Sequence, residues 1–205
     1  NIPSTVTSIG NSAFSGCKNL RNIILPAGLK TIGESSFDSC PMTSIDFPAQ
    51  LEEIGASAFR NCTGLTSITI PDSVTKIGVA VFYGCTNLTS IITPFVGETR
   101  DTAGCLADLF GTYVEPGRSF DNLTSVTVTD QKTLGSNAFC GGNRSGSSGN
   151  FKYYWAKFPN LETVVLNEGI TEIPAYAFNE LEHLTSVNIP STVTSIGNSA
   201  FSGCK

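Results

Sequence analysis

The sequence predicts a solenoid, in which short units stack side by side, share one parallel β-sheet and bury one continuous core. Two observations carry this prediction. An eighteen-residue sequence occurs twice, at residues 1–18 and at residues 188–205. Phenylalanine also recurs at intervals of 23, 22 and 23 residues, with cysteine three positions after each one, at Phe14, Phe37, Phe59 and Phe82. A unit of this length cannot bury its apolar side chains alone, so its copies must stack.

Each unit opens with a predicted strand. In the unit 65–87, Leu65, Ile68 and Ile70 alternate with serine and threonine, which is typical of a short strand with one buried face. Proline follows most of these strands and ends the ladder, because it lacks an N–H group. We expect one right-handed solenoid of about eight turns over residues 1–205, with its main sheet running the length of the chain. Residues 1–19 are the tail of an earlier unit, and others begin at Leu20, Met42, Leu65, Leu88, Leu123, Leu161 and Leu184.

The turn after the strand keeps a fixed register. An isoleucine or leucine stands five positions before each repeat phenylalanine, as Ile77 does before Phe82, and glycine usually follows it. This glycine could serve a left-handed backbone. Pro174 takes the same place in the unit 161–183, however, and proline is confined to φ of about −65°. We therefore expect the position to need a small or bent backbone and not a left-handed one.

The cysteines predict a ladder of buried thiols. Leu181 takes the cysteine place in the unit 161–183, and a column that accepts leucine is apolar, as free cysteine is. Neither CxxC pairs nor Cys/His spacings occur, which disfavours a metal site. Cys105 and Cys140 lie off the column and could pair with each other. The column consists of Cys17, Cys40, Cys62, Cys85 and Cys204.

Residues 88–160 are irregular units with insertions at about 95–118 and 140–158. In the first insertion, Asp101 or Thr102 could cap a short helix that runs through Leu109 and packs over the core. Thr93 stands where other strands have an apolar residue, which predicts that the sheet is weakest there.

The second insertion carries the aromatic cluster of the chain. Phe151, Tyr154, Trp155 and Phe158 have the spacing of one apolar helix face, which favours a helical lid over the core. The alternative is an exposed stacking platform for sugars or a peptide, formed by Tyr153, Tyr154 and Trp155.

Composition and motifs exclude several functions. The net charge is −5 and charged residues make up 14% of the chain, which disfavours nucleic acid and anionic membranes as partners. No apolar run is long enough for membrane insertion of this segment. His183 is the single histidine, and we interpret it as a solvated turn residue. We predict no enzyme, no cofactor and no metal.

The repeat resembles the BspA-like, or Treponema-type, leucine-rich repeats, whose unit reads LxxLxLPxxLxxIGxxAFxxCxx. The match is close over residues 1–87 and 161–205 and loose over 88–160. It implies a curved solenoid with a parallel sheet on the concave side and short helical or irregular turns on the convex side. It also implies a surface-exposed or secreted bacterial protein, and a few members resemble adhesins for host matrix proteins. We read the chain as a fragment of a longer array, with signal peptide and anchor outside it.

In such a fold, the strand residues between the buried ones point outward and form a candidate ligand face. This stripe is small and hydroxyl-rich, which favours an interaction or adhesion module of modest affinity for a protein or glycan. The alternative is a passive spacer that presents another domain. Neither end has a polar capping unit, which predicts end-to-end self-association. The face consists of Asn22, Ile24, Ser44, Asp46, Ser67, Thr69, Ser90, Ile92, Thr127, Val165 and Asn188, with Ser125, Thr163 and Ser186 beside them.

Overall fold

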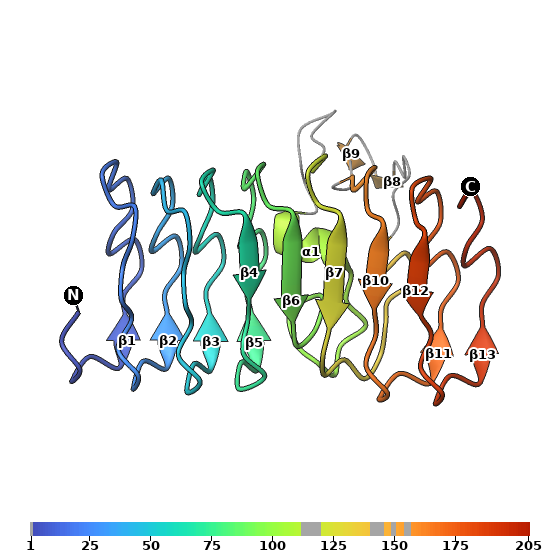
Figure 1. The fold of residues 1–205 in the computed structure, drawn as a ribbon, viewed down its shortest axis with the longest axis horizontal. Coiled ribbons are helices and arrows are strands. Elements are labelled where there is room, and N and C mark those ends of the chain that lie inside the picture. Colours follow the sequence, from blue (N-terminus) through green and yellow to red (C-terminus); the bar gives the residue numbers. More distant parts are fainter. Residues whose placement is uncertain (1, 112–119, 140–145, 149–150, 154–156) are drawn as a thin grey trace.

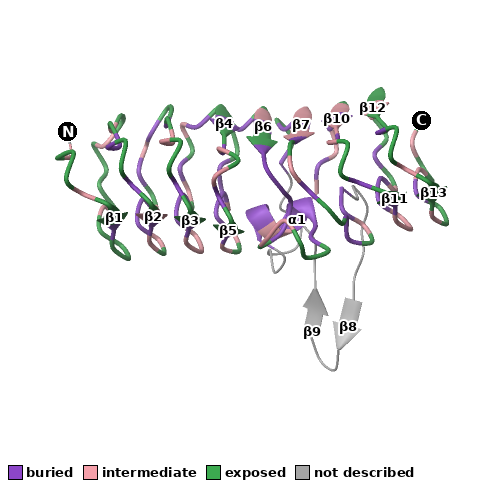
Figure 2. Ribbon diagram, turned by 90° about the horizontal axis from the view of Figure 1, so that it is seen from below, coloured by how far each residue is buried: buried purple, intermediate pink, exposed green. Residues whose placement is uncertain are grey.

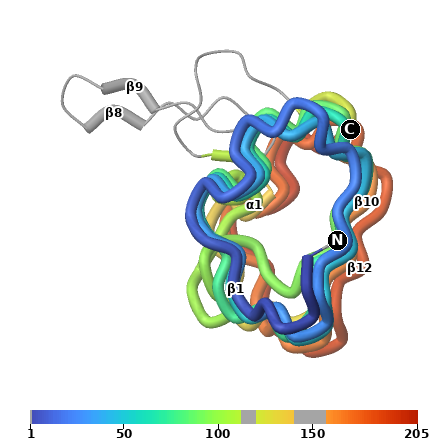
Figure 3. Tube along the Cα trace, turned by 90° about the vertical axis from the view of Figure 1, so that its left-hand side faces the viewer, coloured from blue at the N-terminus to red at the C-terminus, as the bar shows by residue number. Residues whose placement is uncertain are grey.

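Each repeat forms one turn of a right-handed coil, and the turns stack from one end of the molecule to the other (Figures 1 and 3). The computed structural model describes residues 2–111, 120–139, 146–148, 151–153 and 157–205. The two termini lie at opposite ends of the stack, whose axis is nearly straight in Figure 1. The predicted solenoid is thus confirmed, and its curvature is slight.

The main sheet is parallel and joins the strands that open successive units. Its order is β12-β10-β7-β6-β4. Each of the first four strands along the chain turns at least one buried apolar residue, such as Ile68 or Val126, toward the core. In the fifth strand, the corresponding Val187 is half-buried. The strands are β4 (Ser67–Thr69), β6 (Ser90–Thr93), β7 (Ser125–Val128), β10 (Thr163–Val165) and β12 (Ser186–Asn188).

The main sheet does not run the length of the chain, so that part of the prediction is wrong. Residues 22–25 and 44–47 open their units as expected but form no strand. The link from Cys40 to Met42 is one residue shorter than the link from Cys62 to Leu65, and it contains Pro41, which has no N–H group. Regular pairing in the main sheet begins only beyond this short link, at β4.

A side sheet, not predicted from the sequence, lies on another side of the coil (Figure 2). Its strands have two residues each, and the isoleucine before the repeat glycine is the second of them. Ile9, Ile32, Ile54 and Ile77 stand in register across it and are all buried. Its strands are β1 (Ser8–Ile9), β2 (Thr31–Ile32), β3 (Glu53–Ile54) and β5 (Lys76–Ile77), with β11 (Glu172–Ile173) pairing β13 (Ser195–Ile196) nearer the C-terminus.

The glycine after Ile32, Ile54 and Ile77 leaves room for the backbone of the preceding turn. A Cβ atom on Gly78 would lie 2.2 Å from the Ala56 nitrogen, and one on Gly55 would lie 2.5 Å from the Glu34 nitrogen. Gly10, in the first turn, would meet nothing within 4 Å. None of the three has a positive φ, which confirms that the position needs a small backbone and not a left-handed one. Left-handed residues stand instead two positions later, at Ser12, Ser35, Ser57, Ala80, Asn137, Tyr176 and Ser199.

The repeat phenylalanines stack as a ladder inside the coil. Phe14 and Phe37 have ring centroids 5.2 Å apart and are nearly parallel, and the spacing from Phe37 to Phe59 is 5.3 Å. A second run joins Phe178 to Phe139 at 5.1 Å and to Phe201 at 4.9 Å. The rings at the middle of each run are fully buried.

The helix α1 (Leu106–Phe110) replaces the phenylalanine turn of its unit. Its Phe110 lies 6.2 Å from Phe82, and the amide of Phe82 donates to the Leu109 carbonyl at 2.9 Å. The predicted packing over the core is therefore confirmed, because Leu106, Leu109 and Phe110 are all buried.

The predicted cap of this helix is wrong. Asp101 instead pairs with Lys132 at 2.7 Å, and Thr102 bonds to Thr99. The helix begins five residues later, where the Asp108 carboxylate accepts the amide of Cys105. An acidic residue inside the first turn can serve the free amides of a helix start as well as one that precedes it.

The sheet beside the first insertion is not its weakest part. Thr93 is buried, its hydroxyl donates to the Phe95 carbonyl at 2.8 Å, and it pairs with Val128 in a four-residue register. That ladder is the longest among the described strands. The hydroxyl finds a local acceptor, so a polar residue is accommodated in the buried column.

Gln131 fastens the first insertion to the coil. Its side chain is fully buried, and its Oε1 atom accepts the Val96 amide at 2.8 Å. Its Nε2 group, which carries two N–H donors, lies 2.8 Å from the Thr133 carbonyl and 3.2 and 3.3 Å from the carbonyls of Thr102 and Arg100, which share the second donor. All polar atoms of the side chain are thereby satisfied in the interior.

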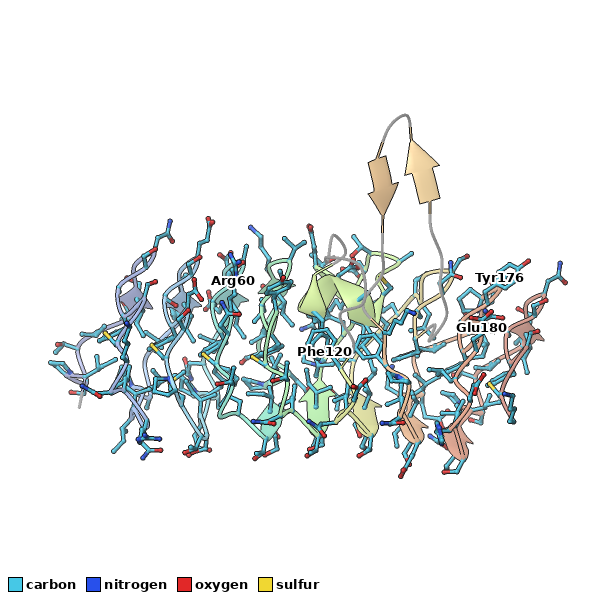
Figure 4. The ribbon with its side chains drawn as sticks, turned by 90° about the horizontal axis from the view of Figure 1, so that it is seen from above. Arg60, Phe120, Tyr176 and Glu180 are labelled. Carbon is cyan, nitrogen blue, oxygen red and sulfur yellow. The ribbon has the colours of Figure 1, made fainter. Side chains whose placement is uncertain are left out.

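The second insertion contains an antiparallel hairpin of β8 (Gly146–Ser148) and β9 (Phe151–Tyr153). Figure 4 draws it on the side away from the main sheet, as expected for an insertion that leaves the main ladder intact.

Candidate ligand-binding face

The outward residues of the main sheet form two ladders in strict register. The first is Ser67, Ser90, Ser125, Thr163 and Ser186. The second is Thr69, Ile92, Thr127, Val165 and Asn188. All ten are exposed or half-buried, because side chains alternate between the two faces of a strand. We call these two ladders together the outer face.

The outer face is uniform on one ladder and varied on the other. Hydroxyl groups occupy every place of the first ladder. Apolar, hydroxyl and amide side chains alternate along the second, where Ile92 is 39% exposed. The Asn188 amide donates to the Leu166 carbonyl at 3.2 Å, so one of its groups is already bound within the protein.

The four N-terminal residues of the predicted ligand face lie outside the strands. Asn22, Ile24, Ser44 and Asp46 are all exposed, and Ile24 is the most exposed large apolar residue described, at 67%. The Thr43 hydroxyl contacts the Asn22 side-chain oxygen at 3.4 Å. The structure therefore joins the predicted residues from Ser67 onward into one ladder and leaves these four beside it without regular pairing.

A column of threonine hydroxyls next to the outer face bonds to the backbone of the preceding turn, a role that the sequence analysis did not predict. The Thr89 hydroxyl donates to the Thr66 carbonyl at 2.9 Å, and the Thr124 hydroxyl donates to the Thr89 carbonyl at 3.3 Å. Thr185 makes the equivalent bond to Glu162. The recurrence of threonine directly after the apolar residue that opens each of these units could have indicated this column. These hydroxyls tie neighbouring turns together and are not free for a ligand.

The aromatic cluster does not form one helix face. Residues 151–153 are a strand, so the predicted helical lid is wrong there. Aromatic residues favour strands, and a partner strand lies close by. Phe158 is buried and contacts Phe110 and Phe120, with centroids 5.3 and 5.9 Å apart (Figure 4 labels Phe120). Tyr154 and Trp155 lie outside the described residues, and Tyr153 is described only as part of β9.

The thiols of the repeat column bond to the preceding turn. The Cys40, Cys62 and Cys85 thiols donate to phenylalanine carbonyls at 3.1 to 3.2 Å, and Cys204 does the same. Burial raises the pKa of the Cys85 thiol to about 12, and burial likewise raises the pKa of Cys62. The ladder of buried free thiols is confirmed for Cys40, Cys62 and Cys85, whereas Cys204 in the last turn is half-buried and Cys17 in the first turn is exposed.

Of the two cysteines off the column, Cys105 is among the described residues. Cys105 carries a buried free thiol, whose pKa is raised by burial and by the Asp108 carboxylate. Cys140 lies outside the described residues. Within the described part of the chain, no group of three His, Cys, Asp or Glu side chains could hold a metal ion.

The ionisable side chains that could serve catalysis, His183 and the carboxylates of Glu52, Asp101 and Asp108, have other partners or face solvent. His183 is exposed in a turn, and Glu52 pairs with Lys30 at 2.7 Å on the surface. Asp101 and Asp108 serve the ion pair and the helix start described above. In the part of the chain that is described, no helix is long and apolar enough to cross a membrane.

Stacked repeat turns, one parallel main sheet and an outward stripe of small side chains define a leucine-rich-repeat solenoid. The family model of the BspA type leucine rich repeat region matches six copies in this chain, over residues 1–101 and 149–205. The chain belongs to this family.

Solved structures of bacterial proteins share the fold. The chain is similar to a leucine-rich repeat protein from Bacteroides ovatus, with 30% identity, all of this chain and 57% of that chain covered, and a TM-score of 0.51. It is also similar in fold to a leucine-rich repeat protein of T. pallidum, with 22% identity, 99% of this chain and 74% of that chain covered, and a TM-score of 0.50. The chain thus spans little more than half the length of the B. ovatus protein. Comparison with the curated proteins gave no match.

Proposed function

We propose that this chain is a non-catalytic interaction or adhesion module that binds a protein or glycan through the outer face. The observation that carries the proposal is the contrast between the two ladders. The first ladder carries a hydroxyl group at every place. The second ladder, by contrast, varies at equivalent places, with Thr69, Ile92, Thr127, Val165 and Asn188. Variation on an exposed ladder of a regular scaffold is typical of a recognition surface.

The chemistry of the outer face supports an extended ligand and modest affinity. The ten side chains carry no charge and include no Tyr, Trp or Arg, the residues that dominate tight interfaces. Their regular spacing offers many weak contacts along a line, which suits a chain-like partner better than a compact one. Asp46, beside the strands, adds one exposed carboxylate.

The place of action that we propose is the cell surface or the extracellular space of a bacterium. Membership of the BspA type family supports it, and so does an exterior covered mainly by Ser, Thr, Asn and Gly with only 14% charged residues in the chain.

The alternative is a passive spacer. The specific observation in its favour is that many polar groups near the outer face are already bonded within the protein, including the Thr89 and Thr124 hydroxyls and the Asn188 amide. Such bonds stiffen a stack and leave fewer groups for a ligand.

A triple lysine variant distinguishes the two. Asp46→Lys, Thr69→Lys and Ile92→Lys together place three cations along the face, and we expect binding to immobilised matrix proteins, glycan arrays or bacterial cells to fall at least about tenfold. The matched control is Glu53→Lys, Val79→Lys and Thr171→Lys, which changes the net charge equally at exposed positions away from the outer face. Binding that both variants retain rejects the outer face as the site. Binding to no partner by the unaltered chain favours the spacer.

A further inference from the structure

A groove runs along the side sheet, on a different side of the coil from the outer face (Figure 2). It has a volume of about 370 Å³ and crosses β2, β3 and β5, where the repeat glycine follows the buried isoleucine. Gly33, Gly55 and Gly78 line the groove and have no side chain to fill it. The backbone of successive turns is therefore accessible along this line.

Four exposed charged side chains line the groove. Glu53 and Lys76 stand in register as the first residues of β3 and β5, and they face outward because the isoleucine after each of them is buried. Glu98 follows in the next turn, where its carbonyl accepts the Ile77 amide at 2.9 Å. Glu34 takes the place directly after the repeat glycine. Three carboxylates against one ammonium group give the groove a net charge of −2.

These charges are not paired within the molecule. Among the described residues, no ion pair involves any of the four side chains. The adjacent Glu52, by contrast, is paired with Lys30 at 2.7 Å. Lys76 offsets one of the three carboxylates, so the net field stays negative. Carboxylates that line a groove raise the local concentration of cations, which makes the groove complementary to a basic ligand.

Two backbone amides in the groove also have no hydrogen-bond partner among the described residues. Asn11, Glu34, Ala56 and Val79 are equivalent positions, each directly after the repeat glycine. The Asn11 Oδ1 atom accepts the Glu34 amide of the next turn at 2.9 Å. The amides of Ala56 and Val79 have no such bond. The preceding turn cannot serve Val79 at all, because Ala56 has no polar side-chain atom. Both amides therefore need an acceptor oxygen from outside the chain.

The Asn11 side chain shows which kind of group fits this place. Its Oδ1 atom lies over the first glycine of the groove, 2.7 Å from the point that a Cβ atom on Gly33 would occupy. This oxygen is an amide carbonyl, the same group that a peptide backbone carries at every residue. Polyamines and metal ions have positive charge but no acceptor oxygen. An extended peptide with lysine or arginine side chains has both.

We propose that the groove binds an extended, basic segment of a partner protein. Carbonyl oxygens of the segment accept the Ala56 and Val79 amides, and its cationic side chains pair with Glu34, Glu53 and Glu98. Each exposed ion pair is weak, so the affinity is modest and falls with added salt. The site is separate from the outer face and does not depend on any ligand there.

Neutral variants of the three carboxylates test the charge of the groove. The probe is a short labelled peptide of alternating lysine and serine, and fluorescence anisotropy at low ionic strength measures its binding to the full chain. Glu34→Gln, Glu53→Gln and Glu98→Gln together should weaken binding at least about tenfold, because each exposed pair contributes about two- to fivefold. Val79→Glu adds a carboxylate to the groove and should strengthen binding by about two- to fivefold.

A matched control separates the groove from the acidity of the whole chain. Glu162→Gln, Glu172→Gln and Glu182→Gln change the net charge equally at exposed positions that do not line the groove. This variant should bind the peptide as the unaltered chain does. Spermine, which has the charge without the acceptor oxygens, should bind the unaltered chain at least about tenfold more weakly than the peptide.

The two surfaces are also separable. The outer-face variant with Asp46→Lys, Thr69→Lys and Ile92→Lys should keep the basic peptide. Its control, which carries Glu53→Lys and Val79→Lys, should lose the peptide and keep any ligand of the outer face. Failure of one proposal thus leaves the other to its own test.

Several results would overturn the proposal. A peptide that does not bind the unaltered chain at low ionic strength rejects the site. An equal loss in the Glu162, Glu172 and Glu182 variant shows attraction to the whole acidic chain and not to the groove. Spermine that binds as tightly as the peptide rejects the role of the amides. Binding that Val79→Glu leaves unchanged or weakens also opposes the proposal, and a damaged fold cannot produce the expected gain.

Discussion

The glycine after each side-sheet isoleucine is required by the distance between turns. At Gly33, Gly55, Gly78 and Gly197 an added Cβ atom would lie 2.7 Å or less from the backbone of the preceding turn. The left-handed residues two positions later are mostly serine, alanine or tyrosine, which cost about 1 to 2 kcal/mol each in that conformation. At this place of the repeat, the approach of the neighbouring turn and not a left-handed φ requires glycine.

Gly78→Ala and Gly10→Ala test this directly. We expect Gly78→Ala to lower the free energy of unfolding by at least about 2 kcal/mol, because its Cβ atom would meet rigid backbone 2.2 Å away. Gly10→Ala should change it by less than about 0.5 kcal/mol, because its Cβ atom meets nothing. Urea unfolding at low protein concentration measures both. Equal losses in the two variants would show that contact with the neighbouring turn does not set the cost of the substitution.

The buried thiols predict a loss of stability at high pH. In the folded chain the Cys85 pKa is about 12, above the ordinary value of 9.0 that it takes on unfolding. A raised folded pKa stabilises below the unfolded pKa and loses that contribution as the pH rises toward the folded one. For Cys85 alone the loss between pH 8 and pH 10 is about 1.4 kcal/mol.

The measurement compares unfolding at pH 8 and pH 10 in a reducing agent. Cys85→Ala should be less stable than the unaltered chain at pH 8, yet lose about 1.4 kcal/mol less on going to pH 10. The same pH dependence in both proteins would show that this thiol is not protonated preferentially in the folded state.

The helix α1 replaces the phenylalanine turn of its unit and makes the same two kinds of contact, a ring in the core and backbone acceptors for the turn before it. Phe110 continues the ring ladder from Phe82, and Phe120 and Phe158 surround it at 4.5 and 5.3 Å. The helix also accepts the amides of Ala80 and Phe82, which in other units bond to the next phenylalanine turn. The ladder of backbone bonds is therefore not interrupted by the insertion.

Phe110→Ala should be among the most damaging changes. The ring is fully buried, so its removal is expected to cost about 3 to 5 kcal/mol. Phe14→Ala, at the half-buried end of the same ladder, is the control and should cost clearly less. Thermal and urea unfolding give both values. A small effect at Phe110 would mean that α1 covers the core without stabilising it.

The sequence predicts some of these elements and not others, for physical reasons. The column of Phe37, Phe59 and Phe82 predicts the core, because a side chain that recurs at one place in stacked turns must face the same interior. The strands of the side sheet have two residues each, which is too short for the alternation of apolar and polar residues that predicts a strand. The aromatic spacing from Phe151 to Phe158 predicts a helix where residues 151–153 form the strand β9, because apolar spacing alone cannot show that a partner strand is present.

The outer face, too, was predictable from the sequence only in part. Alternation along the strands correctly predicts that Ser67, Thr69 and Ile92 face outward. Asn22, Ile24, Ser44 and Asp46 follow the same alternation, yet form no ladder. The pattern records which side faces solvent, whereas pairing depends on the length of the preceding link, as at Pro41.

In the 205-residue stack, every inner turn packs against a neighbouring turn on both sides, whereas the first and the last turn pack against one neighbour each. We expect amide hydrogen exchange in residues 2–18 and 188–205 to be at least about tenfold faster than in β6 and β7 at low micromolar protein. Mass spectrometry of quenched fragments measures this. Uniform protection along the chain would instead show that the stack opens only as one cooperative unit.

The main sheet keeps its register even where the connections between its strands differ in length. Ser90, Ser125 and Thr163 lie opposite one another, although 35 and 38 residues separate them along the chain. The described elements of the two insertions, α1 and the hairpin of β8 and β9, lie on the side away from the main sheet (Figures 2 and 4). Chain length and the geometry of the outer face are thus independent variables. A foreign peptide grafted between β6 and β7, or between β7 and β10, would be displayed on the far side while the spacing of the outer face stays the same.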